Sequence, residues 1–219
     1  LTQCGVPVPK GSTVNSAQEA WSVAQDIGLP VVVKPIDANH GRGVSLDLKT
    51  REEVEAAFHI ALREEENTEV IVEQFIRGEE HRLLIVGDKL VAASCGETVQ
   101  ITGDGVSTVE ELIESQVNTD PRRGLEEEFP LEKIILAEQG NVVLEIQKQG
   151  YQVNSVLPKD TTIVVQRTGN MTMDVTDQVH PAVADMAVLA AKMVGLDIAG
   201  IDLVTPDVSR PLQETGGAA

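Results

Sequence analysis

Aromatic residues and positive charges are scarce in this sequence. Only 2% of its 219 residues are aromatic, so a folded core must be built mostly from valine, isoleucine, leucine and alanine. Lysine and arginine number 17 against 35 acidic residues, and the net charge of -18 opposes binding to phosphate backbones and anionic membrane surfaces. We therefore expect neither nucleic acid nor a membrane as a partner, and we expect any anionic ligand to be held by local cations.

Cysteine is rare too, and no apolar run reaches the length of a membrane span. Cys4 and Cys95 are far apart, and we interpret them as two free thiols in a reducing cytosol rather than as a disulfide. The longest apolar run, 183–196, is interrupted by two charged residues. The start of the chain has neither the features of a signal peptide nor an initiator methionine, so we expect a cytoplasmic piece of a longer protein.

Four segments have the pattern of amphipathic helices. Ser16 and Thr50 each stand three residues before a glutamate, the spacing of a capping box, and a third helix is expected from Ser107. A fourth should end before Gly195, a residue that suits the position after a helix. The residues expected to face the core are Ala17, Ala20, Trp21, Ala24 and Ile27, then Val54, Ala57, Phe58, Ala61 and Leu62, then Val179, Val183, Met186, Ala190 and Met193.

Apolar runs rich in β-branched residues lie between these helices. They predict strands at 31–34, 43–48, 69–75, 81–86, 89–94, 162–166 and 198–205. Because neighbouring strands and interspersed helices both occur, we expect an α+β or mixed α/β layer structure rather than a regular βαβ series. Residues 118–160 are less periodic, and we interpret them as an insertion with short helices.

Lys34 stands at the end of an apolar strand and is followed by Pro35, which blocks regular continuation. A polar loop with Gly41, Arg42 and Gly43 comes next. Glycines let backbone N–H groups approach an anion closely, so a lysine beside such a loop suits phosphate binding. The pattern is neither a Walker A sequence nor G-x-G-x-x-G, so a solvated lysine beside an ordinary glycine turn remains the alternative.

Two carboxylates interrupt apolar strands. Glu73 lies in the run 69–75, and this strand with its outward backbone groups could hold an adenine edge while Glu80 accepts hydrogen bonds from ribose hydroxyls. Asp202 stands among apolar residues, where burial of an unpaired carboxylate is costly. Asp202 therefore either points to a solvated face or meets a cation, and Mg²⁺ takes one or two carboxylates together with phosphate oxygens.

These stretches, in this order, resemble the ATP-grasp superfamily. Within it they are similar to the ATP-grasp domain of cyanophycin synthetases, and glutathione-forming ligases share several of them. "NHGRGV" and "GIDLVTPDVSRPL" favour the first group. The segments that carry the resemblance are 5–11, 31–44, 73–87, 103–113, 120–124, 148–158, 174–181 and 195–218, which span nearly the whole chain.

The resemblance implies an α+β fold in which two α+β subdomains sandwich ATP. The lid-bearing subdomain would comprise 1–75, and the second would comprise 76–219 with an insertion around 98–160. The implied site residues are Lys34, Asn39, His40, Gly41, Arg42 and Gly43 at the ATP phosphates, Glu73, Phe75 and Ile76 at the adenine, Glu80 at the ribose, Arg82 at the transferred phosphate or substrate, and Asp202 at Mg²⁺.

The implied reaction is ADP-forming amide ligation with ATP and Mg²⁺ as cofactors. ATP would phosphorylate the C-terminal carboxylate of a poly-aspartate chain, an anionic polypeptide acceptor, and the amine of aspartate would then attack the acyl phosphate. The resemblance also implies a homo-oligomeric parent with an N-terminal region and a Mur-ligase-like region that adds arginine.

Two departures from the family pattern stand out. The segment between 170 and 174 is shorter than in the family, and the chain stops before the family's last metal-binding strand. We therefore expect this piece alone to be inactive. A glutathione-type ligase and a nucleotide-binding module without turnover remain the alternative functions.

Overall fold

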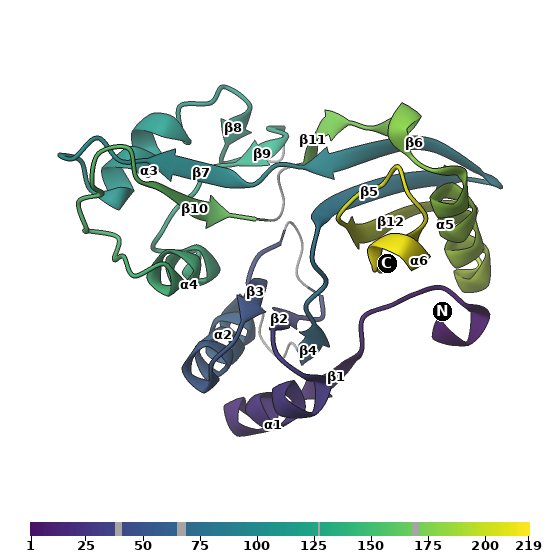
Figure 1. Cartoon of the computed structure of the whole chain (residues 1–219). Helices are drawn as coiled ribbons and strands as arrows, with labels where there is room; N and C mark the ends of the chain where they lie inside the picture. The colour runs from purple at the N-terminus through teal and green to yellow at the C-terminus, as the bar shows by residue number, and fades with distance from the viewer. Residues whose placement is uncertain (38–40, 65–68, 127, 168–170) are drawn as a thin grey trace. The chain divides into compact units, whose positions relative to one another are not determined.

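The computed structural model describes residues 1–37, 41–64, 69–126, 128–167 and 171–219 (Figure 1). The chain divides into two compact units. Unit 1 comprises residues 1–10, 74–97 and 170–219, and unit 2 comprises residues 11–73 and 98–169. Each unit is thus assembled from separated segments, whereas the sequence led us to expect the continuous segments 1–75 and 76–219. Both units combine helices with sheets, which confirms the predicted α+β class.

One part of unit 2 is a four-stranded sheet covered by two helices. The strand order is β1 (Gly11–Val14), β4 (Val70–Gln74), β2 (Val31–Pro35) and β3 (Ser45–Leu48). Helices α1 (Ala17–Ile27) and α2 (Arg51–Glu64) pack side by side against this sheet (Figure 1). Their shared core contains Val31, Val33, Leu48, Val54 and Phe58, and Trp21 packs against it.

Both helices begin where the capping residues predict. The Ser16 hydroxyl accepts a hydrogen bond from the Glu19 N–H (3.1 Å), and Thr50 and Glu53 form the reciprocal pair expected of a capping box. The third predicted cap is wrong by one residue. Helix α3 (Val109–Gln116) is capped by Thr108 with its partner Glu111, because Ser107 instead donates to Asp104 in the preceding turn.

The rest of unit 2 packs around a second core. Strands β7 (Val99–Thr102) and β10 (Thr162–Gln166) pair antiparallel, and β8 (Arg123–Gly124) pairs with β9 (Leu131–Glu132). Helices α3 and α4 (Gly140–Lys148) supply the apolar side chains that close this core. The expected short helical structure within 118–160 is therefore present as α4.

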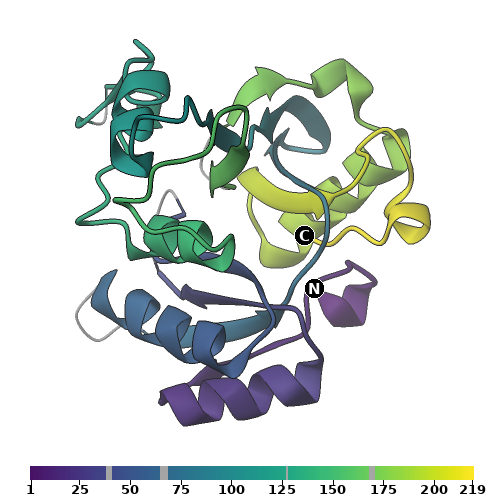
Figure 2. The same ribbon diagram turned by 60° about the vertical axis from the view of Figure 1, so that its left-hand side comes forward.

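Unit 1 is built on one antiparallel sheet of order β11–β6–β5–β12. Its strands are β11 (Met171–Asp174), β6 (Lys89–Gly96), β5 (Glu79–Val86) and β12 (Ile198–Thr205). Helix α5 (Pro181–Val194) packs against β5, β6 and β12 (Figure 2), and short helices η1 (Thr2–Cys4), η2 (Thr176–Gln178) and α6 (Leu212–Thr215) complete the unit. Gly195 ends α5 with a φ of 80°, as predicted.

Two residues expected in the core are exposed instead. Leu62 is 46% exposed and Met193 is 50% exposed. A helix turns by about 100° per residue. Leu62, one residue past buried Ala61, and Met193, two residues past buried Ala191, therefore lie outside the buried stripes of their helices.

The described part of the chain contains no helix both long enough and apolar enough to cross a membrane. Its two cysteines are free thiols, Cys4 exposed and Cys95 buried. Burial raises the pKa of Cys95 to about 12, and a hydrogen bond to Glu79 and its charge add to the shift.

Candidate functional site

Lys34 and Glu73, two of the predicted residues, form an ion pair within unit 2. They project from adjacent strands β2 and β4, and Lys34 Nζ lies 2.7 Å from Glu73 Oε2. The Lys34 side chain is 37% exposed and that of Glu73 18%. Because β2 is an inner strand of its sheet, Lys34 does not lie on a sheet edge. It is a cation held in place by a carboxylate.

The glycine loop follows β2 and leads into β3. Gly41 and Gly43 adopt φ of 73° and 68°, the left-handed region that glycine favours. A Cβ on Gly43 would lie 3.3 Å from Pro35 Cδ and would clash with the Glu64 side chain. Burial raises the pKa of Glu64, and the charge of Arg42 opposes this shift. Asn39 and His40, also predicted here, lie outside the described residues.

Replacing Gly43 with alanine should destabilise the protein for two reasons, strain and crowding. A left-handed residue with a Cβ costs about 1–2 kcal/mol, and contact with Pro35 and Glu64 should add to this cost. Gly150→Ala is the matched control, because Gly150 has a φ of 86° with nothing within 4 Å of an added Cβ. Urea unfolding should show a larger decrease in the free energy of unfolding for Gly43→Ala than for the control. Equal losses would mean that the contacts of Gly43 add nothing to its conformational role.

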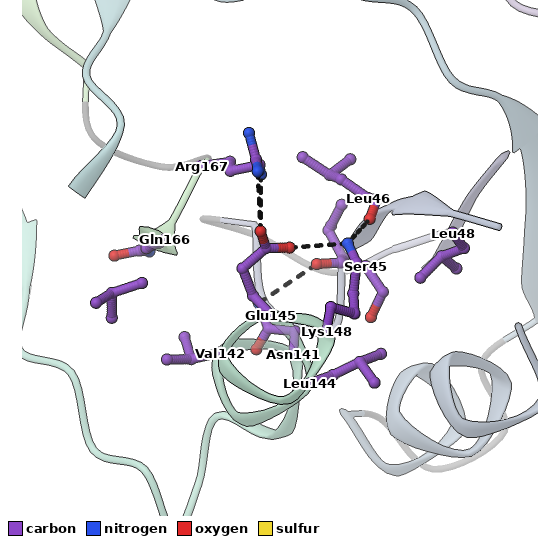
Figure 3. A pocket seen from close by; sticks show the side chains of 12 residues that line it. Ser45, Leu46, Leu48, Asn141, Val142, Leu144, Glu145, Lys148, Gln166 and Arg167 are labelled. Carbon is purple, nitrogen blue, oxygen red and sulfur yellow. Dashed lines mark hydrogen bonds and ion pairs between the residues drawn. The ribbon is translucent and has the colours of Figure 1, made fainter. Parts of the chain in front are cut away.

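A cluster of polar residues from the second part of unit 2 anchors this loop (Figure 3). Asn141 donates to the carbonyls of Gly41 and Val44, each at 3.4 Å, and Lys148 Nζ donates to the Leu46 carbonyl at 2.6 Å. Glu145 accepts from Lys148 Nζ (2.9 Å) and from Arg167 Nε (3.0 Å). We call Asn141, Glu145, Lys148 and Arg167 the anchoring cluster.

The anchoring cluster lines a small pocket that also contains unpartnered polar atoms. Ser45 Oγ, Asn141 Oδ1 and Gln166 Oε1 are buried without a hydrogen-bond partner. The sequence interpretation missed this cluster. A signal was present, since Asn141, Glu145 and Lys148 recur at i, i+4 and i+7 and so share one face of α4.

The predicted residues of unit 1 meet on the exposed face of its sheet. Arg82 on β5 and Asp202 on β12 are register partners, and Arg82 Nε lies 3.7 Å from Asp202 Oδ1. Their side chains are 60% and 61% exposed, so the Asp202 carboxylate is accessible to solvent and is not a buried, unpaired charge. Gly200 leaves room for the guanidinium, because a Cβ there would lie 3.1 Å from Arg82 Nε.

Three further residues predicted for the ATP site lie in β5 or just before it in the chain. Phe75 and Ile76 are half-buried in the connection between β4 and β5, and Glu80 is half-buried on β5. The adenine, ribose and phosphate roles assigned to the individual residues stay predictions.

Comparison with known proteins identifies the class. Residues 1–101 match the family model described as the carbamoyl-phosphate synthase L chain, ATP binding domain. This match and the mixed α+β architecture indicate an ATP-grasp fold. The sequence of the chain is similar to the cyanophycin synthetase of Synechocystis sp., with 41% identity over 99% of the chain and 25% of that protein.

Further relatives are glutathione-forming proteins. The glutathione biosynthesis bifunctional protein of Mannheimia succiniciproducens is 33% identical over 97% of the chain and 29% of that protein. Among solved structures, a bifunctional glutathione synthetase from Pasteurella multocida is 30% identical over 96% of this chain and 29% of that one, with a TM-score of 0.46. The chain thus spans about a quarter of the length of the curated relatives that it matches.

Proposed function

We propose that this chain is the ATP-binding domain of an ADP-forming ligase that joins aspartate to the C-terminal carboxylate of a poly-aspartate backbone. The observation that carries the proposal is the 41% identity to a cyanophycin synthetase over 99% of the chain. Such a reaction needs ATP phosphates held by cations and a carboxylate activated as an acyl phosphate. Positioning and charge stabilisation supply most of the catalysis in this kind of transfer.

In this proposal, unit 2 binds the phosphates. Lys34 is oriented by Glu73 at 2.7 Å, which keeps its ammonium group in one place before the nucleotide arrives. The loop with Gly41, Arg42 and Gly43 offers backbone N–H groups that no Cβ shields at the glycines. In a chain of net charge -18, these local cations are what an anionic nucleotide needs.

In unit 1, Asp202 is the proposed ligand of Mg²⁺, and Arg82 is the proposed partner of the transferred phosphate. The Asp202 carboxylate suits this role because it is exposed and its contact with Arg82, at 3.7 Å, is longer than a hydrogen bond. Mg²⁺ commonly binds one or two carboxylates together with substrate phosphates. When bound, it would offset the negative charge of the phosphates.

Replacing Lys34 with alanine should weaken ATP binding at least tenfold. A charge-assisted hydrogen bond is worth about 1.5–3 kcal/mol, and the substitution also leaves the Glu73 carboxylate facing the phosphates. Calorimetric titration of ATP into the full-length protein measures the effect. Lys49→Ala is the control, because Lys49 is 60% exposed and pairs only with Asp47 among the described salt bridges. An unchanged affinity of Lys34→Ala for ATP would show that Lys34 does not bind the phosphates.

The reaction itself is tested by ADP release from the full-length protein with two substrate sets. The proposal predicts ADP release with aspartate and a poly-aspartate primer. The similarity to glutathione-forming proteins favours a second candidate, which would instead consume ATP with γ-glutamylcysteine and glycine. ATP binding without ADP release from either set would favour a nucleotide-binding module without turnover.

The length of the relatives supports a longer parent protein. We propose that this parent carries an N-terminal region and a Mur-ligase-like region, forms homo-oligomers and works in the cytoplasm. Size-exclusion chromatography with light scattering on the full-length protein would test the oligomeric state.

A further inference from the structure

Three side chains with metal-ligand atoms lie together in unit 1, and none of them belongs to the predicted ATP site. Glu79 and His81 are two residues apart on β5, and Cys95 on β6 is the direct register partner of His81. A carboxylate oxygen, an imidazole nitrogen and the thiol sulfur all lie within 4.8 Å of one another. His81 is 3% exposed and Cys95 is 2% exposed, so the strands hold both side chains in a packed setting.

The spacing of two of these atoms fits a single small cation. Cys95 Sγ lies 3.4 Å from Glu79 Oε2. In a tetrahedral zinc site with Zn–S of about 2.3 Å and Zn–O of about 2.0 Å, the sulfur and the oxygen lie about 3.5 Å apart. The two ligand atoms are therefore already at the separation that such an ion requires.

The orientation of His81 fits the same role. Its Nδ1 lies 2.9 Å from the Glu79 carbonyl, so the neutral ring donates from Nδ1 and keeps a lone pair on Nε2. Among the described residues, no hydrogen-bond partner of Nε2 is found. Metal-ligating histidines usually have this arrangement, in which the other ring nitrogen donates to a carbonyl and fixes the ring.

This group lies on the opposite face of the sheet from Arg82 and Asp202. Side chains alternate along a strand, so His81 lies on the buried face of the sheet with Leu83 and Ile85, while Arg82 lies on the exposed face. Beside the group is an open cavity, walled in part by η2 and by the loop after β12. Two other carboxylates at this cavity are already engaged, Asp174 by Thr176 and Asp207 by Ser209.

We propose that Glu79, His81 and Cys95 bind one Zn²⁺ ion, with the fourth coordination position open to this cavity. Sulfur and imidazole ligands suit Zn²⁺, whereas Mg²⁺ prefers oxygen ligands. The thiol proton leaves to solvent as the zinc–sulfur bond forms. The site is separate from the proposed Mg²⁺ position, so it neither depends on the proposed ligase activity nor tests it.

Zinc titration of the metal-free, reduced protein tests this inference. In the presence of excess Mg²⁺, which occupies oxygen-only sites, calorimetry should show one bound Zn²⁺. Substituting Co²⁺ should give a thiolate-to-cobalt charge-transfer absorption band. The variants Cys95→Ser and Glu79→Gln should each weaken Zn²⁺ binding by at least about 10-fold, and the Co²⁺ band should disappear in Cys95→Ser.

Matched controls separate this site from the other thiol and the other carboxylate. Cys4→Ser removes the exposed cysteine, and Asp202→Asn removes the carboxylate on the opposite face. Both variants should bind Zn²⁺ with the same affinity as the unsubstituted protein. Because Glu79 is exposed, Glu79→Gln leaves the core intact and remains informative if Cys95→Ser fails to fold. Unchanged Zn²⁺ affinity in Glu79→Gln, or loss of the Co²⁺ band in Cys4→Ser, would overturn the proposal.

Discussion

Replacing Arg82 with alanine should lower turnover of the full-length protein by about 100- to 1,000-fold, the usual effect of removing one group that stabilises transition-state charge. The free energy of unfolding should hardly change, because the side chain is 60% exposed and its contact with Asp202 is long. Steady-state kinetics with ADP release as the signal, together with urea unfolding, measures both quantities.

The control for this experiment is Arg210→Ala. Arg210 belongs to the same unit, is 56% exposed and pairs with Glu214 one helical turn away. It should leave turnover unchanged. A further variant, Gly200→Val, should lower turnover less than Arg82→Ala, because the new side chain displaces the guanidinium without removing it. If Arg82→Ala and Arg210→Ala have the same turnover, Arg82 has no part in the reaction.

Replacing Glu145 with glutamine should destabilise the protein by about 3–5 kcal/mol, the cost of removing one partner from a buried ion pair. Glu145 is 8% exposed and pairs with Lys148, whose side chain is 11% exposed. The neutral amide keeps the shape of the side chain but leaves Lys148 without its counter-charge beside the Leu46 carbonyl. Urea unfolding, monitored by circular dichroism, measures the decrease in the free energy of unfolding.

Glu55→Gln is the control for this prediction. Glu55 lies in the same unit and pairs with Arg51 at i, i+4, with the side chains 34% and 53% exposed, respectively. Exposed pairs of this kind contribute about 0.3–0.5 kcal/mol. Similar losses in the two variants would show that the anchoring cluster stabilises the unit no more than a surface pair does.

The elements predicted best were those with local signals. The Ser16 and Thr50 caps fixed the starts of α1 and α2, because a side-chain acceptor near the first free N–H groups is decided within one turn. The strand 162–166 was also predicted at its observed bounds. Ser107 misled the prediction because two adjacent hydroxyl residues compete for one cap, and the Asp104 turn takes the first of them.

The site was predictable only in part. Lys34 and Asp202 were selected as candidates because a charge within an apolar strand is conspicuous. Their pairing with Glu73 and Arg82 could not be predicted, because it depends on strand neighbours that are distant in sequence. The contact of the anchoring cluster with β3 could not be predicted for the same reason. Lys148 and the Leu46 carbonyl are 102 residues apart, and no local pattern shows that they meet.

The division of the units along the chain has a consequence for synthesis on the ribosome. Unit 2 is complete once residue 169 has been made, whereas the sheet of unit 1 still lacks β11 and β12, and helix α5. Until β12 has been made, β5 has one unpaired edge. Until α5 has been made, the β5 side chains Leu83 and Ile85 lack the helix that packs against them in the folded unit. Nascent chains are therefore expected to complete unit 2 first, and the interval before β12 emerges is when chaperone binding to β5 and protection from aggregation matter most.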